Sequence, residues 1–166
     1  LYFGRTGQAG MMDQIQKCFP LPVFVKPCRG GSSIGISRVD DWDQLEEAIA
    51  EAFRFDDHVI IEEGIPITEE LEVSVLGTPD AMTISPPGKL IAGDVFYTYK
   101  DKYVDARTRF EIPAQDLPVD VSETVREMSG RAYTLTNCFG LARVDFLYSR
   151  DSGHLLLNEI NTMPGF

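Results

Sequence analysis

The last two strand-like runs of the chain, residues 141–150 and 154–161, are separated only by Asp151-Ser152-Gly153. A three-residue connection that ends in glycine is typical of a β-hairpin, because glycine readily adopts the left-handed conformation that such a turn requires. If Arg150 pairs with His154, the register of the whole hairpin follows. This feature constrains the fold most strongly, because it predicts pairs of facing residues as well as two strands.

The predicted register places Asp145 opposite Glu159 and Arg143 opposite Asn161, all on one face. Two carboxylates on opposed strand residues, about 5 Å apart, would repel by about 3 kcal/mol at an effective dielectric constant of about 20. A solvated face with screened charges, a shared proton or a purely structural pair are alternatives. The neighbouring residues predict a largely buried hairpin, which favours a bound divalent cation. These neighbours are Leu141, Phe146, Leu155, Leu156 and Leu157.

The candidate metal ligands in this hairpin are carboxylate and amide oxygens, with neither cysteine nor histidine among them. Such hard donors suit Mg²⁺, which proteins usually hold with one or two carboxylates together with substrate phosphates. The hairpin therefore predicts a magnesium ion and, with it, a nucleotide.

The stretch VKPCRGGSSIG, residues 25–35, is a candidate phosphate-binding loop. Lys26 lies near the end of a strand-like run and precedes glycines whose backbone can approach a phosphate closely. The stretch is not a Walker A motif, because the lysine precedes the glycines and a strand, rather than a helix, follows. By itself it could equally be a flexible hairpin tip with an exposed lysine.

The remaining pattern predicts an α+β fold rather than a Rossmann alternation. Asp40, with Asp43 three residues later, is expected to cap a helix whose core stripe contains Trp42, Leu45, Ile49, Ala52 and Phe53. A second helix is expected from Asp120 or Ser122 to Gly140, with an apolar face of Val121, Val125, Met128, Ala132, Leu135 and Phe139. Strands are expected at residues 22–27, 34–39, 58–63 and 70–77.

Three further segments are expected to form a turn, a loop or irregular structure. SPPGKL, residues 85–90, favours another hairpin. Residues 95–113 combine aromatic and charged side chains without a clear period, which predicts a long exposed loop. Residues 1–14 are expected to be irregular.

Composition excludes several classes of function. The net charge of −11 argues against binding to a nucleic-acid backbone, because phosphate neutralisation needs clustered Lys and Arg. No apolar run approaches the roughly 20 residues that span a bilayer, which predicts no membrane partner. Three cysteines, an odd number without metal-type spacing, predict free thiols and a cytoplasmic location.

Taken together, the motifs resemble the D-alanine–D-alanine ligases of the ATP-grasp superfamily. The resemblance runs from Phe19 to Phe166. It is carried, in the family's order, by FVKPCRGGSSIGIS, IIEEGI, ELEVSVLG, FYTYKDKYVD, GLARVDF and LNEINTMPGF.

The resemblance implies two lobes with largely antiparallel sheets and packed helices that hold ATP between them. Residues 1–62 would form the smaller lobe with the glycine-rich lid loop. Residues 63–166 would form the larger lobe with the substrate loop and the magnesium-binding hairpin. Family members also carry an N-terminal substrate domain and further residues after MPGF, which this chain does not contain.

The resemblance also implies roles for individual residues. Asp145, Glu159 and Asn161 would ligate two magnesium ions, with Mn²⁺ as a substitute. Arg143 and the backbone of Gly165 would stabilise the charge that develops during the reaction. Tyr103 would close over the site and connect to Ser32. The nucleotide would be held by Lys26, Gly31, Ser32, Ser33, Glu62, Glu63, Ile65, Glu70 and Lys102. For the acids of IIEEGI, the alternative is an edge of solvated glutamates.

The activity implied by the resemblance is ATP-dependent joining of two D-alanines through an acyl phosphate, for peptidoglycan precursor synthesis. KDKYVD matches the dipeptide-forming type, although D-serine remains open as the second substrate. The alternatives are a truncated ATP-binding module without ligase activity and another ATP-grasp carboxylate–amine ligase. Family members also suggest a homodimer of the full-length protein.

Overall fold

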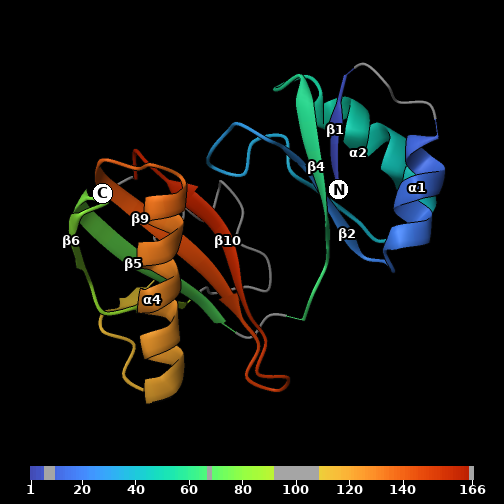
Figure 1. Cartoon of the computed structure of the whole chain (residues 1–166). Helices are drawn as coiled ribbons and strands as arrows, with labels where there is room; N and C mark the ends of the chain where they lie inside the picture. The colour runs from blue at the N-terminus through green and yellow to red at the C-terminus, as the bar shows by residue number, and fades with distance from the viewer. Residues whose placement is uncertain (6–9, 67–68, 92–108, 165–166) are drawn as a thin grey trace. The chain divides into compact units, whose positions relative to one another are not determined.

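The computed structural model describes residues 1–5, 10–66, 69–91 and 109–164 (Figure 1). The chain divides into two compact units between Ile65 and Pro66. Among the described residues, unit 1 is Leu1–Ile65 and unit 2 continues from Pro66. The expected assignment of these units to a lid-bearing lobe and a metal-binding lobe stays a prediction. Of the helices that these ranges contain, none is both long and apolar enough to cross a membrane.

Unit 1 is a four-stranded antiparallel sheet with two helices. In chain order its elements are β1 (Tyr2–Gly4), α1 (Met11–Cys18), β2 (Val23–Pro27), β3 (Ser37–Val39), the 3₁₀ turn η1 (Trp42–Gln44), α2 (Leu45–Ala52) and β4 (His58–Glu63). The strand order is β1-β4-β2-β3. Val23 and Val25 of β2 are fully buried, whereas Phe24 and Lys26 face the less buried side. This alternation leaves the side chain of Lys26 on the open face of the sheet.

Two expectations for unit 1 were wrong. The described part of residues 1–14 contains regular structure, because β1 pairs antiparallel with β4 and α1 buries Met11 and Ile15 in the core. A three-residue strand whose partner lies more than fifty residues away leaves no local signal. The helix cap is Asp41 with Gln44 rather than Asp40 with Asp43, since the Asp41 side chain accepts from the backbone N–H of Asp43.

Unit 2 is an antiparallel sheet covered on one face by a long helix. In chain order its elements are β5 (Glu69–Thr78), β6 (Ala81–Ile84), β7 (Gly88–Ile91), β8 (Arg109–Glu111), α4 (Val119–Leu135), β9 (Gly140–Tyr148) and β10 (Leu155–Asn161). The strand order is β10-β9-β5-β7-β8, and β6 also pairs with β5. Helix α4 lies across β5 and β9, as Figure 1 shows.

The core of unit 2 lies between α4 and the sheet. It contains Leu71, Val73, Val75, Val125, Tyr133, Ala142, Val144 and Phe146. The Tyr133 hydroxyl lies 2.8 Å from the backbone carbonyl oxygens of both Gly77 and Gly140, which share its one hydrogen, and so ties the helix to the facing ends of β5 and β9. Because strand side chains alternate, residues 70, 72, 143 and 145 lie on the opposite face, away from α4.

Three expectations for unit 2 also need correction. The second helix ends at Leu135, not at Gly140, and both Leu135 and Phe139 are exposed. Asn137, with φ of 53°, takes the left-handed position after the helix. SPPGKL does not join a hairpin, because β6 and β7 each pair with β5. Part of the expected loop at 95–113 is strand β8, which pairs with β7.

Candidate functional site

Strands β9 and β10 place Asp145 directly opposite Glu159 and Arg143 opposite Asn161. The expected pairing of these four residues is therefore confirmed. Their roles as metal ligands and as a catalytic cation stay predictions.

The half of the hairpin nearest the turn is not in the predicted register. Leu155 pairs with Tyr148, and a β-bulge between Leu157 and Glu159 restores the expected pairing only in the second half. Gly153 adopts the left-handed conformation, with φ of 70°, but Ser149 rather than Arg150 bonds His154 across the turn. The turn is one residue longer than expected, and the bulge compensates. Without that bulge, a slip of one residue would move Glu159 to the other face.

The hairpin is also less buried than expected, because β10 is the edge strand of its sheet. Leu156 is 43% exposed and Leu157 is 37% exposed. The burial of the hairpin therefore does not support a bound cation between Asp145 and Glu159. Support for such a cation has to come from the arrangement of the polar groups.

The carboxylate of Asp145 is the centre of these polar contacts. Arg143 donates to it twice, from Nε to Oδ1 and from Nη2 to Oδ2, at 2.7 Å each. The amide nitrogen of Asn161 donates to Asp145 Oδ2 at 2.9 Å and to Glu159 Oε1 at 3.3 Å. The cross-strand repulsion between the two acids is therefore offset here by one guanidinium and one amide.

A third acid that the sequence interpretation missed lies in the same row. Glu72 of β5 pairs with Asp145 on the side away from Glu159, and its Oε2 lies 3.4 Å from Nε of Arg143. The pKa of the Arg143 guanidinium is raised, chiefly by the hydrogen bond to Asp145 and further by the charges of Asp145, Glu72 and Glu159, although burial opposes the rise. Arg143 therefore stays charged on this face at any physiological pH.

The donors of the hairpin suit magnesium chemically. They are the carboxylates of Asp145 and Glu159 and the amide of Asn161. The amide nitrogen bonds both carboxylates, so the three groups lie together. Among the described residues, no group of three or more His, Cys, Asp and Glu could hold a metal by itself. A magnesium ion here would therefore need further oxygens, which is the usual situation when phosphates complete its coordination.

In unit 1, Lys26 and Glu62 lie together on the open face of the sheet. Their ammonium and carboxylate groups are 2.5 Å apart, and the side chains are 22% and 39% exposed. Glu62 pairs with Phe24 in the adjacent strand, so Glu62 and Lys26 occupy the same face at neighbouring positions. A nucleotide phosphate that binds Lys26 would have to share or displace this ion pair.

The loop between β2 and β3 contains Gly31, Ser32 and Ser33. Ser32 and Ser33 have φ values of 56° and 57°, so two successive residues other than glycine are left-handed. Such conformations are costly and are concentrated at functional sites. A Cβ on Gly30 or Gly31 would meet nothing within 4 Å, so the backbone there is open to an approaching group.

The remaining expected nucleotide contacts lie near the ends of two strands. Glu63 ends β4, and the N–H of Gly64 continues the ladder by donating to the carbonyl of Pro22 at 2.8 Å. Ile65 follows it and is partly buried. Glu70 of β5 pairs with Leu147, on the same face as Glu72 and Asp145. Lys102, Tyr103 and Gly165 lie outside the described residues.

Two solved structures resemble the whole chain. The VanG D-Ala:D-Ser ligase from Enterococcus faecalis matches with a TM-score of 0.85 and 32% identity, and the match covers 100% of this chain and 47% of that one. D-alanyl-alanine synthetase A from Vibrio cholerae matches with a TM-score of 0.81 and 32% identity, over 99% of this chain and 50% of that one. With the two antiparallel α+β units, these likenesses define the fold as ATP-grasp.

Sequence comparison narrows this class to a family. A family model described as "D-ala D-ala ligase C-terminus" matches residues 4–166. The D-alanine–D-alanine ligase of Acetivibrio thermocellus is 45% identical over an alignment that covers 100% of this chain and 44% of the relative. The chain therefore belongs to the D-alanine–D-alanine ligase family and corresponds to its C-terminal part. It spans about half the length of the curated relatives it matches.

Proposed function

We propose that the protein carrying this chain is an ATP-dependent ligase that joins two D-alanines for peptidoglycan precursor synthesis. The observation that supports this most directly is the register of β9 and β10, which sets Asp145 opposite Glu159 and Arg143 opposite Asn161. Membership of the D-alanine–D-alanine ligase family supplies the reaction class.

In this proposal, the residues that the family resemblance implicates bind magnesium ATP. Lys26 and the loop backbone of Gly31, Ser32 and Ser33 donate to phosphate oxygens, while Glu62, Glu63, Ile65 and Glu70 hold the nucleoside. Asp145, Glu159 and Asn161 hold one or two Mg²⁺ ions, or Mn²⁺ in their place. When bound, the metal neutralises the phosphates and the charge of the transferred phosphoryl group.

The reaction would begin with transfer of the γ-phosphoryl group of ATP to the carboxylate of the first D-alanine, with release of ADP. The amine of the second substrate then attacks the acyl phosphate and expels inorganic phosphate. Arg143 is suited to stabilise the phosphoryl oxygens and the tetrahedral oxyanion, because its guanidinium is held by Asp145 and Glu72 and cannot lose its proton in practice. Lys102, Tyr103, Ser32 and the N–H of Gly165 keep the roles that the family resemblance gives them.

A second candidate is a D-alanine–D-serine ligase. The likeness to the VanG D-Ala:D-Ser ligase, at a TM-score of 0.85, specifically favours its consideration. The two candidates use the same nucleotide chemistry and differ only in the amine that attacks the acyl phosphate.

The test is phosphate release from ATP by the intact protein with no amino acid, with D-alanine alone, and with D-alanine plus D-serine. We expect release to depend on D-alanine and to yield D-alanyl-D-alanine as the product detected by mass spectrometry. A mixed product formed in preference to the dialanine would favour the second candidate. Release that is independent of D-alanine would contradict both.

We further propose that the protein acts in the cytoplasm and that the full-length protein is a homodimer. Cys18, Cys28 and Cys138 are all free thiols, as expected in a reducing compartment. Size-exclusion chromatography with light scattering tests the dimer. A monomer at micromolar concentration would contradict it.

A further inference from the structure

Two adjacent residues between α2 and β4 contact the two ends of the loop that joins β2 to β3. Asp56 bonds Arg29 near the start of this loop, and Phe55 packs on Gly35 near its end. Residues distant from the loop in sequence therefore hold it at both ends, and all of these contacts lie within unit 1.

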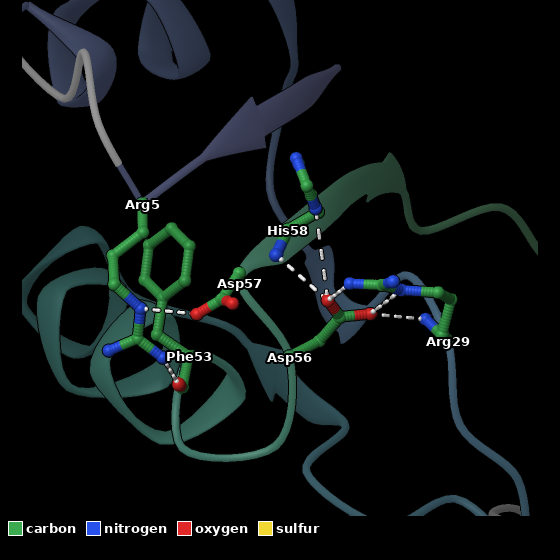
Figure 2. A network of polar contacts seen from close by, with 6 residues as sticks. All are labelled: Arg5, Arg29, Phe53, Asp56, Asp57 and His58. Carbon is green, nitrogen blue, oxygen red and sulfur yellow. Dashed lines mark hydrogen bonds and ion pairs between the residues drawn. The ribbon is translucent and has the colours of Figure 1, made fainter.

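The carboxylate of Asp56 accepts four hydrogen bonds. Its side chain is only 2% exposed. It accepts from the Arg29 backbone N–H at 2.7 Å, from Arg29 Nε at 3.1 Å and from Arg29 Nη2 at 2.6 Å, as Figure 2 shows. It also accepts from the backbone N–H of His58 at 3.0 Å. Both the side chain and the backbone of Arg29 are thus fixed to the segment that precedes β4, with charge-assisted bonds that are stronger than neutral ones.

The Phe55 contact depends on a missing side chain. Gly35 has φ of 74°, and a Cβ placed on it would lie 2.5 Å from the Phe55 ring and 2.9 Å from Pro27. The ring therefore lies directly on the backbone of Gly35. Only glycine allows both the left-handed conformation and this approach.

Between the two contacts lie the left-handed residues Ser32 and Ser33. A left-handed residue other than glycine is energetically costly, so two in succession persist only when the surroundings enforce them. The contacts of Asp56 and Phe55 are such surroundings, because they set where the loop leaves β2 and where it returns to β3.

We propose that Phe55 and Asp56 are positioning residues that hold the phosphate-binding loop in its binding conformation before the nucleotide arrives. This inference rests on the proposed function, because it assigns the loop to ATP. A loop that is ordered in advance loses less conformational entropy on binding, so its ligand binds more tightly. Neither residue needs to touch the nucleotide for this effect.

The next residue in the chain provides a matched control. Asp57 also accepts from an arginine, at 2.8 Å from Nε of Arg5, but both of these side chains are more than half exposed. Arg5 additionally donates to the carbonyl of Phe53 (Figure 2). This second pair joins β1 to the end of α2 and does not include a residue of the loop.

The experiment compares Asp56→Asn, Arg29→Met and the double variant with Asp57→Asn in the intact protein. We expect each single variant in the Asp56–Arg29 pair to raise the KM for ATP about tenfold or more, with little change in the KM for D-alanine. The double variant should be no worse than Asp56→Asn alone, because Arg29→Met removes only the side-chain ion pair that Asp56→Asn already disrupts. Asp57→Asn should keep the wild-type KM for ATP.

The outcomes separate the inference from the function on which it rests. If wild-type protein does not bind ATP, the proposed function fails. If wild-type protein binds ATP and folded Asp56→Asn and Arg29→Met bind it equally well, the positioning role is wrong. If Asp56→Asn does not fold, Arg29→Met decides, since the Arg29 side chain is 74% exposed and the Asp56 carboxylate keeps its bonds from the backbone N–H groups of Arg29 and His58. Additive effects in the double variant would also contradict a shared role.

Discussion

Arg143 donates two hydrogen bonds of 2.7 Å to the carboxylate of Asp145, two residues along the same strand. Side chains at this spacing lie on the same face of a strand. Arg143, the candidate catalytic cation, and Asp145, a candidate metal ligand, are thus held together by the fold itself. A salt bridge of purely structural purpose would have the same geometry, so the distinction has to come from kinetics.

Arg143→Gln should lower kcat about 100- to 1,000-fold with little change in the KM for ATP. The reason is that charge stabilisation aimed at the transition state is lost while the ground state is largely unaffected. Steady-state kinetics of the intact protein measure this, with Arg131→Gln on the exposed side of α4 as the control. A structural salt bridge would instead lower the melting temperature and leave kcat unchanged in the folded protein.

Lys26→Met should raise the KM for ATP about 10- to 100-fold, because a charge-assisted bond to a phosphate is lost. The substitution also leaves Glu62 without the ammonium group that lies 2.5 Å away. ATP titration followed by calorimetry tests this, with Lys17→Met in the last turn of α1 as the control. Equal affinities in the two variants would remove Lys26 from the nucleotide site.

Gly35→Ala should destabilise the protein by at least about 1–2 kcal/mol, because the left-handed conformation of this residue is costly for alanine. The Cβ would also overlap the Phe55 ring. Denaturant unfolding measures the loss. Gly30→Ala is the control, because its Cβ would meet nothing within 4 Å and its φ is not positive. Equal losses in both variants would show that the Phe55 contact does not restrict the loop.

The hydrogen bonds to Asp56 predict how the stability of the fold depends on pH in the acid range. The pKa of Asp56 is lowered from its usual value of 3.8, first by the side-chain bond from Arg29 and then by the backbone bonds from Arg29 and His58, although burial opposes this. A carboxyl group whose pKa is lower in the folded state stabilises the fold above its unfolded pKa. That stabilisation is lost as the pH falls toward the folded pKa.

The difference in melting temperature between wild type and Asp56→Asn should therefore be largest above about pH 5 and should shrink below about pH 4. Thermal unfolding followed by circular dichroism measures it. A difference that stays constant from neutral to acid pH would mean that the charge of Asp56 is not what stabilises the fold. Asp57→Asn, which changes an exposed pair, should show a much smaller difference throughout.

The sequence predicted those parts of the site that depend on local patterns. The turn at Gly153 and the alternation of β9 and β10 were sufficient to bring Asp145 and Glu159 together. They did not predict the β-bulge. The turn contains one more residue than expected and the bulge adds one residue to the strand, so the two shifts in register cancel at Asp145 and Glu159. The cap of the 3₁₀ turn η1, which leads into α2, was expected one residue early, since Asp40 and Asp41 are chemically equivalent candidates.

Features that depend on distant partners were not predicted. Glu72 belongs to the acidic row only because β5 pairs with β9, some seventy residues later. Asp56 follows a helix and has no sequence feature that connects it to Arg29. The sequence predicts that β5 is a strand but does not say which strand lies beside it. Long-range pairing is decided by the packing of the whole unit rather than by local propensity.

In the proposed function, Asp145 and Glu159 share the magnesium that ATP brings. Binding of Mn²⁺ in the presence of ATP, followed by electron paramagnetic resonance, tests it most directly in wild type, Glu159→Gln and Glu123→Gln, an exposed acid of α4. We expect Glu159→Gln to bind Mn²⁺ at least about tenfold more weakly, while Glu123→Gln binds like wild type. Equal Mn²⁺ affinity in wild type and a folded Glu159→Gln would contradict the account.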